Sequence, residues 1–231
     1  MKKWILVLFC ALFAGPAAAQ IQRSYHYGVV PTENITTFEV NPSLTTIDDS
    51  AGISSSQLTL KTYRVISPRY NWGVEVPLAR YESPEKSVSG LGDALVSMSW
   101  LNPQADGVFG YGVKMEMFVP TATDKRLGAG KLQASPSVFI LRRLFDGAYA
   151  ALGYKYYVSV AGDHARDDIN MGRLRLNMGY TSPNEWWVTT NLYYYMNYEH
   201  GGQAELIPEV EVGTLVNDGT AFYANVSTHA A

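Results

Sequence analysis

The chain has 231 residues, a formal net charge of −3 at pH 7 and a single cysteine. The acidic balance argues against a nucleic-acid partner, and one cysteine excludes both an internal disulfide and a cysteine metal site. Beyond the N-terminus no apolar run approaches the ~18 residues of a spanning helix, so any membrane insertion must use strands. The length fits one domain, and 16 tyrosines, 5 tryptophans and 20 glycines without a helical period indicate an all-β protein.

Residues 1–19 have the three parts of a secretory signal. Two lysines follow the first methionine, residues 4–13 are apolar, and small residues precede Gln20. We expect cleavage after Ala19, which leaves residues 20–33 as a periplasmic N-terminal segment. The alternative, an N-terminal membrane anchor, is less favoured because the apolar run is shorter than the ~20 residues of a spanning helix.

From residue 34 onward the sequence repeats segments in which apolar and polar residues alternate. Between Val108 and Val119, for example, Phe109, Tyr111 and Val113 fall on one face, and glycines and charged residues fall on the other. A period of two is typical of strands with two different faces. Read in this way, the chain contains eleven strands, near 34–47, 55–67, 71–81, 92–102, 107–120, 131–143, 148–160, 171–181, 185–198, 205–216 and 219–228.

The links between these strands alternate between short turns and longer polar loops. Short turns lie near 67–69, 103–106, 144–146, 182–184 and 217–218, and longer links lie at 48–54, 82–91, 121–130, 161–170 and 199–204. Outer-membrane barrels have short periplasmic turns and longer outer loops. We therefore predict that residues 34–231 form an antiparallel up-and-down transmembrane β-barrel. The alternative is a soluble sandwich or jelly roll, in which the apolar face would point inward.

Aromatic residues gather near the short turns, as expected for a ring at the membrane interface. They are Trp72, Trp100, Phe109, Tyr111, Phe145, Tyr149, Tyr180, Trp186 and Phe222.

Charged and polar residues on the second face of the strands are candidates for the barrel lumen, because Lys or Arg facing lipid at mid-membrane costs ~2 to 4 kcal/mol. Arg64 is the exception, since it shares a face with apolar residues near a turn. Arg173 and Arg175 are expected to lie opposite two glutamates across the interior. Such a ladder either fills the lumen structurally or forms a selective path, and the sequence leaves both open. The predicted lumen residues are Lys114, Glu116, Lys155, Tyr157, Arg173, Arg175, Asn191, Tyr193, Glu209 and Glu211.

No pattern in the sequence indicates an enzyme, a metal site or a cofactor. The histidines lie in loops or near the ends of the chain, and none is placed beside a serine with a catalytic signature. The polar loop around His164, with Asp163, Arg166, Asp167 and Asp168, has no ligand spacing and is interpreted as a solvated loop.

Gly90, Gly92 and Asp93 form a motif at the mouth of a strand. Asp93 is a candidate for binding a cation or a solute. The favoured interpretation is a turn, in which glycines permit the bend and Asp93 binds local backbone.

Three short motifs resemble the outer-membrane transporter family associated with the MetA pathway of phenol degradation. They are Gly90-Leu91-Gly92-Asp93 at the start of a strand, Val119-Pro120-Thr121 at the end of one, and Gly128-Ala129-Gly130-Lys131 after it. The resemblance covers most of the chain from about residue 34. It implies a barrel of about twelve strands and uptake of small hydrophobic or aromatic compounds.

One feature departs from the usual pattern of such barrels. The chain stops at Thr228, His229, Ala230 and Ala231, whereas a final strand usually closes with an aromatic residue. With about twelve strands expected and about eleven present, we predict that the last strand is missing. An open edge in a bilayer leaves unpaired backbone groups, so such a form should insert poorly or close irregularly.

The sequence therefore predicts a porin-like channel or transporter in the outer membrane of a Gram-negative cell. Its expected partners are the lipid bilayer, a small-molecule solute and, during biogenesis, the barrel assembly machinery. Two alternatives remain open: a structural or adhesive barrel without transport, and an outer-membrane enzyme that modifies lipids.

Overall fold

The protein is described here by a computed structural model covering residues 5–13, 34–48, 51–102, 108–199, 201–217 and 219–228, with residues 5–13 described by their backbone alone. Strands and connecting turns make up these residues, and none of them forms a helix long and apolar enough to cross a membrane. The predicted cleavage position after Ala19 and the segment 20–33 lie outside the described residues.

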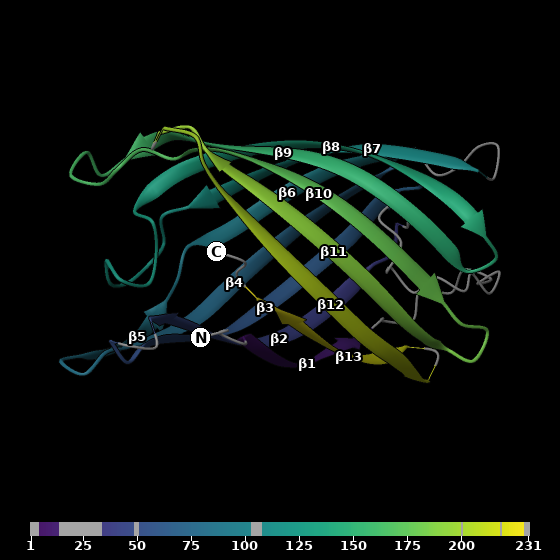
Figure 1. Cartoon of the computed structure of the whole chain (residues 1–231), viewed down its shortest axis with the longest axis horizontal. Coiled ribbons are helices and arrows are strands. Elements are labelled where there is room, and N and C mark those ends of the chain that lie inside the picture. The colour runs from purple at the N-terminus through teal and green to yellow at the C-terminus, as the bar shows by residue number, and fades with distance from the viewer. Residues whose placement is uncertain are drawn as a thin grey trace.

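The described residues form thirteen strands (Figure 1). They are β1 Ile5–Phe13, β2 Thr37–Asp48, β3 Ile53–Ser67, β4 Tyr70–Glu82, β5 Ser87–Leu91, β6 Ala94–Asn102, β7 Phe109–Val119, β8 Lys131–Phe145, β9 Ala148–Gly162, β10 Asn170–Thr181, β11 Trp186–Asn197, β12 Gln203–Asn217 and β13 Thr220–Ser227.

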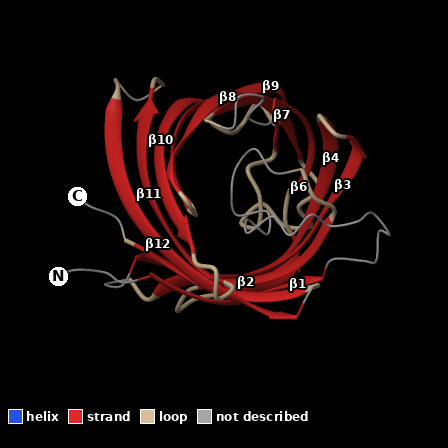
Figure 2. Ribbon diagram, turned by 90° about the vertical axis from the view of Figure 1, so that its right-hand side faces the viewer, coloured by secondary structure: helices blue, strands red, loops and turns tan. Residues whose placement is uncertain are grey.

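All the strand pairs are antiparallel, and the pairs close into a ring. From β6 to β13 each strand pairs with the next in sequence; β13 pairs with β1, β1 with β2, β2 with β3 and β3 with β4. The sheet consequently curls back on itself (Figure 2). Two successive strands share one position in this ring, because β5 pairs with Leu78–Glu82 of β4 and β6 pairs with Tyr70–Glu75. The ring therefore has twelve strand positions.

The eleven predicted strands are confirmed as β2, β3, β4 and β6 to β13. The remaining position, between β13 and β2, is filled by β1, whose residues the sequence assigns to the export signal. The predicted loop 82–91 is wrong in part, because Ser87–Leu91 pairs with β4 as β5. Serines and glycine dilute the alternation there, so the pattern does not reveal the strand.

The two faces of the ring have the opposite polarity to those of a soluble β-protein. On β7, Val113 and Met115 are 45% and 46% exposed, whereas Glu116, the residue after Met115, is only 7% exposed. The same inversion recurs around the ring, where large aliphatic side chains are exposed and Ser97, Asn177 and Asn191 are buried. A soluble sandwich would bury its apolar face, so the observed polarity contradicts that alternative. Arg64 lies on the exposed face, as the sequence predicts.

The two ends of the ring have links of different length. At one end β3 and β4 are joined through 68–69 and β8 and β9 through 146–147. At the other end β7 and β8 are joined through 120–130 and β9 and β10 through 163–169. The predicted alternation of short and long links is therefore present in these four connections, and the longer loops share one end.

Candidate functional site

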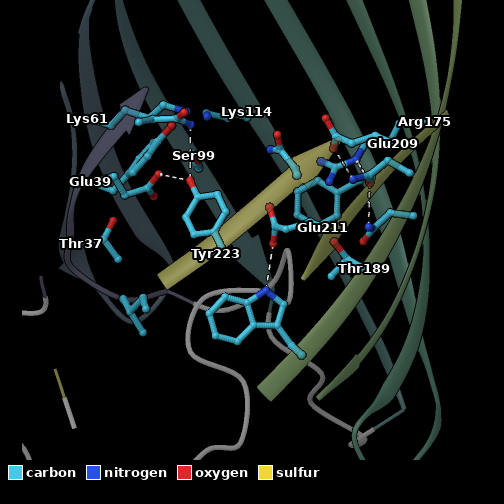
Figure 3. Close-up of a pocket in the computed structure, with 18 of the residues that line it drawn as sticks. Thr37, Glu39, Lys61, Ser99, Lys114, Arg175, Thr189, Glu209, Glu211 and Tyr223 are labelled. Atoms are coloured by element: carbon cyan, nitrogen blue, oxygen red, sulfur yellow. Dashed lines mark hydrogen bonds between the residues drawn. The ribbon is translucent and has the colours of Figure 1, made fainter. Parts of the chain in front are cut away.

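The interior of the ring contains a cavity of about 480 Å³ (Figure 3). Residues from every strand between β2 and β13 except β5 contribute to its lining. The lining is polar and balanced in charge, with three acidic side chains, Glu39, Glu209 and Glu211, and three basic ones, Lys61, Lys114 and Arg175. Alternation explains this lining, because the residues next to the exposed apolar ones in each strand must point inward.

A second cavity of about 260 Å³ adjoins the first inside the ring. The two share Lys114, Phe139, Arg175 and Asn177. Glu116, Lys155 and Arg173 line the second cavity, together with small residues of β9. We refer to the two as the larger and the smaller cavity.

A relay of hydrogen bonds centred on Asn191 joins β10 to β12. The Nε of Arg175 donates to Oδ1 of Asn191 at 2.8 Å, and Nδ2 of Asn191 donates to Oε1 of Glu209 at 2.8 Å. Asn177 donates to the same Oδ1, also at 2.8 Å, and Tyr193 donates to Glu209 at 3.2 Å. The ladder expected between arginines and glutamates therefore runs through an amide on the intervening strand β11, which keeps the charged groups apart.

Glu211 has a different partner from Glu209. Its Oε1 accepts a hydrogen bond from the indole Nε1 of Trp187 at 3.0 Å, and the Trp187 side chain is fully buried. Gly213 lies opposite Trp187 in the register. A Cβ at Gly213 would lie 2.1 Å from the indole ring, so this glycine makes the space that Trp187 occupies.

Glu116 is the anionic centre of the smaller cavity. It forms ion pairs with Lys114, at 2.7 Å, and with Lys155. Glu116 and Lys155 are both buried. Buried charges are found where they are paired, and here one carboxylate serves two ammonium groups.

Tyrosine rings surround the guanidinium of Arg173. Its Cζ lies 5.7 Å from the ring centre of Tyr157, 5.0 Å from that of Tyr193 and 5.8 Å from that of Tyr195. These are cation–π distances. Tyr157 does not line either cavity, and it contributes through this contact and through its ring 4.7 Å from the ammonium of Lys155. Tyr193 lines the larger cavity.

Several lumen residues are absent from the prediction. Glu39 accepts a hydrogen bond from Tyr223 at 3.1 Å, and Glu75 accepts one from Tyr63 at 2.5 Å and lies 3.8 Å from Lys61. They lie on β2, β3, β4 and β13. In most of these strands Thr, Ser and small residues weaken the alternation in the sequence. In the structure the inward face is clear, because every second residue along each strand points into the ring.

One predicted girdle residue lies elsewhere. Tyr149 is 2% exposed and lines the larger cavity. Tyr149 is an even number of positions from the inward residues Ala151 and Lys155, so it lies on the same face of β9. Gly179 on the neighbouring strand makes room for its ring, since a Cβ at Gly179 would lie 2.4 Å from that ring. At the exposed surface, Phe145, Tyr180 and Trp186 are in ring contact, with centres 6.5 Å and 5.6 Å apart.

The strand-mouth motif lies outside both lumen cavities and holds a loop. Oδ1 of Asp93 accepts the backbone N–H of Ala122 at 3.2 Å, and Oδ2 accepts that of Ala129 at 2.6 Å. Asp93 does bind backbone, but the prediction that this backbone is local is wrong, because both N–H groups belong to the β7–β8 loop. The sequence does not show that this loop folds over the mouth of β6.

Glycines allow this close approach. A Cβ at Gly90 would lie 2.0 Å from Oγ1 of Thr123, and one at Gly92 would lie 3.1 Å from the carbonyl oxygen of Leu127. At Gly128 a Cβ would meet Oδ1 of Asp93 at 2.4 Å. The glycines on both sides of the contact are thus required for packing.

The β9–β10 loop braces the same β7–β8 loop. Arg166 donates from Nη1 to the carbonyl of Gly128 and from Nη2 to that of Lys125, both at 2.6 Å. Nearby, the ammonium of Lys131 lies 2.8 Å from Oδ1 of Asp168. Hydrogen bonds from Lys131 and Ser159 hold the pKa of the Asp168 carboxyl below its ordinary value. These loops and the strand-mouth motif form one connected cluster at the long-loop end.

The acidic loop around His164 has a structural explanation. Asp163 accepts the N–H of Ala165 at 2.9 Å, and Asp168 pairs with Lys131. Among the described residues no group of three potential metal ligands comes together. The other three histidines, His26, His200 and His229, lie outside the described residues.

The comparisons with known proteins give a likeness in structure. No family model matches the chain, and no curated protein matches it. A crystal structure of an outer membrane channel from Pseudomonas putida F1 superposes with a TM-score of 0.58 over 99% of this chain and 95% of that one, at 10% identity. At this identity the likeness shows a shared barrel fold, and the similar protein is a channel.

Proposed function

We propose that this protein is a channel in the outer membrane that admits small molecules through the lumen of its barrel. The observation that carries this proposal is the inversion of polarity: charged cavities lie inside a ring whose outer face is apolar. An exposed apolar surface of this extent marks contact with a membrane or with another protein. It matches the lipid-facing band of transmembrane barrels, which alternate apolar residues outward and polar residues inward.

The dimensions of the strands support insertion in a bilayer. A transmembrane strand needs about 9 to 11 residues, and β7 has 11 residues while β8, β9 and β12 have 15. The contact among Phe145, Tyr180 and Trp186 at the short-turn end is consistent with an interfacial girdle. The predicted export signal and the shared fold with an outer membrane channel both favour the outer membrane as the location.

For the solute we propose small hydrophobic or aromatic molecules. The rings of Tyr63, Tyr193, Tyr223 and Phe139 line the larger cavity and offer contacts to a planar solute. The resemblance to transporters of the phenol-degradation type points in the same direction. The polar lining limits this class to compounds that also carry a hydrogen-bonding group, because a purely apolar molecule would displace water from charged side chains without replacing its hydrogen bonds.

Two measurements test this proposal. Cell fractionation should place the protein in the outer membrane in an amount that falls when the barrel assembly machinery is depleted. Proteoliposomes should swell in an isotonic solution of benzyl alcohol faster than liposomes with heat-denatured protein. Correct insertion without any solute-dependent swelling would instead favour a structural barrel with a filled lumen.

A further inference from the structure

The smaller cavity has an excess of positive charge. Its lining includes four basic side chains, Lys114, Lys155, Arg173 and Arg175, and one acidic side chain, Glu116. The adjoining larger cavity has equal numbers of both. A molecule moving between the two therefore meets a local positive field at the smaller cavity.

The two lysines use the only carboxylate of this cavity. Glu116 pairs with both Lys114 and Lys155. Among the residues that the structure describes, Arg173 and Arg175 have no carboxylate oxygen within the 4.0 Å of an ion pair. The two arginines therefore lack a counter-charge from the protein. Because an unpaired charge in a low-dielectric interior is costly, a bound anion would stabilise them.

The neighbours of Arg173 contact the flat faces of its guanidinium and leave most of the N–H donors at its edge without a hydrogen-bond partner. Three tyrosine rings surround the guanidinium at cation–π distances. A guanidinium also has five N–H donors in its plane. The Nε of Arg173 is buried without a partner, and Nη1 makes one long contact, 3.5 Å, to the hydroxyl of Tyr195. The fork of donors that matches a carboxylate is thus unoccupied by protein groups.

We propose that the smaller cavity binds small organic anions through a carboxylate held by Arg173, with Arg175 as the adjacent second charge. The proposal rests on the channel function and names the charge of its solute. The cavity volume of about 260 Å³ is below the ~300 Å³ of pockets that hold drug-sized ligands. Its occupant is therefore the size of a single substituted ring, and an aromatic carboxylate combines this size with the ring contacts of the lumen.

Arg175 links this cavity to the larger one. Its Nε is bound to Asn191, while its Cζ lies 5.6 Å from the ring centre of Tyr193. Because Arg175 lines both cavities, an anion leaving one remains within reach of the same positive charge in the other. This arrangement favours passage of anions over cations along the lumen.

The test compares three solutes of nearly equal size: benzoate, benzyl alcohol and benzylamine, which at pH 7 are an anion, a neutral molecule and a cation. Efflux of each isotope-labelled compound is measured from proteoliposomes that contain the full chain. We expect benzoate to leave at least about tenfold faster than benzylamine, because a unit charge in a narrow lumen interacts strongly with fixed charges. In Arg173→Gln this preference should fall several-fold.

Two variants separate binding by the planar guanidinium from the effect of positive charge alone. In the wild type we expect millimolar benzoate to inhibit efflux of benzyl alcohol, because a bound carboxylate occupies the smaller cavity. Arg173→Lys keeps the positive charge and removes the planar fork, so it should keep the anion preference and lose this inhibition. Arg64→Gln removes an arginine from the exposed face near the short-turn end and should leave both properties unchanged. If Arg173→Gln does not fold, the wild-type rates for benzoate, benzyl alcohol and benzylamine are sufficient to test the anion preference.

The outcomes are distinct. Absence of efflux for all three solutes would overturn the proposed channel function. Efflux with equal rates for benzoate and benzylamine, or faster for benzylamine, would leave the channel in place and overturn the anion site. A chloride-over-potassium preference in a salt gradient without inhibition by benzoate would also overturn it, because a field alone would then explain the selectivity.

Discussion

Glu116 on β7 and Lys155 on β9 form a buried ion pair across the strand that separates them. On the intervening strand β8, Ser135 lies opposite Glu116 and Ser137 lies opposite Lys155 in the register. These small side chains leave the space in which the two longer ones meet. The pair fastens three strands on the lumen side, where apolar packing is sparse.

Glu116→Gln should destabilise the barrel by about 3 kcal/mol, because it leaves the buried Lys155 and the half-buried Lys114 without a carboxylate. The free energy of unfolding, measured by urea titration in lipid vesicles, checks this value. Lys155→Met combined with Glu116→Gln should cost less than the sum of the two single changes. Methionine would rest against the rings of Phe118 and Tyr157, which now face the ammonium of Lys155.

Glu82→Gln is the matched control for the ion pair. Glu82 pairs with Arg80 at 2.5 Å, and both side chains are about half exposed. An exposed pair contributes about 0 to 1 kcal/mol, so this variant should unfold almost as the wild type does. Equal losses in Glu82→Gln and Glu116→Gln would contradict the structural role of the buried pair.

Asp93→Asn should loosen the β7–β8 loop. An amide has one acceptor oxygen, so one of the N–H groups of Ala122 and Ala129 would lose its partner, at a cost of about 1 to 3 kcal/mol. Trypsin should then cleave after Lys125 or Arg126 about tenfold faster or more, with the barrel intact. Asp146→Asn, in the exposed turn between β8 and β9, serves as the control and should leave the cleavage rate unchanged.

The ion pair of Asp168 with Lys131 should be insensitive to mild acid. Because the pKa of Asp168 is lowered in the folded state, its contribution is fully present above the ordinary carboxyl pKa and is lost as pH falls from there through the lowered pKa of the folded protein. A nitroxide label at Ala165→Cys should show the same mobility at pH 7 and pH 5, and greater mobility below about pH 4. Asp168→Asn should give the mobile spectrum at every pH; a wild-type spectrum that becomes mobile already between pH 7 and pH 5 would contradict the role of this ion pair.

The alternation in the sequence was sufficient for the architecture and for the inward face of the best-patterned strands. Lys114, Arg173 and Glu209 could be placed because charge contrasts sharply with the apolar residues on either side of each. Glu39 and Tyr223 could not, because threonine and small residues blur the two faces of β2 and β13. The partner of Asp93 was also unreadable, since the contact joins segments about thirty residues apart and depends on how a loop folds.

The N-terminal region provides a test of how the ring closes. Ala11 on β1 lies opposite Val40 on β2 and Phe222 on β13. With β1 in place, the Cα atoms of residues 40 and 222 are two strand spacings apart, about 9.5 Å, which is too far for a disulfide. Removal of residues 1–19 would bring β2 and β13 together as a parallel pair, because both are antiparallel to β1.

We expect the protein extracted from outer membranes to begin at Gln20 by intact mass, and Val40→Cys with Phe222→Cys to form a disulfide in it. The unprocessed form, kept by replacing the alanines at 17 and 19 with leucine, should not form this bond. Mature protein that retains residues 5–13 would contradict the predicted signal. Processed protein without the disulfide would contradict direct closure of β2 on β13.

Thr189→Cys and Thr190→Cys show whether the solute passes through the lumen. These neighbours on β11 face opposite sides: Thr189 is buried and lines the larger cavity, and Thr190 has the parity of the exposed Leu192. Conductance across a planar bilayer is recorded before and after a charged methanethiosulfonate reagent is added. Modification should change the conductance of Thr189→Cys by several-fold and leave that of Thr190→Cys as it was. Equal responses of the two variants, or no conductance through either, would contradict passage through the lumen.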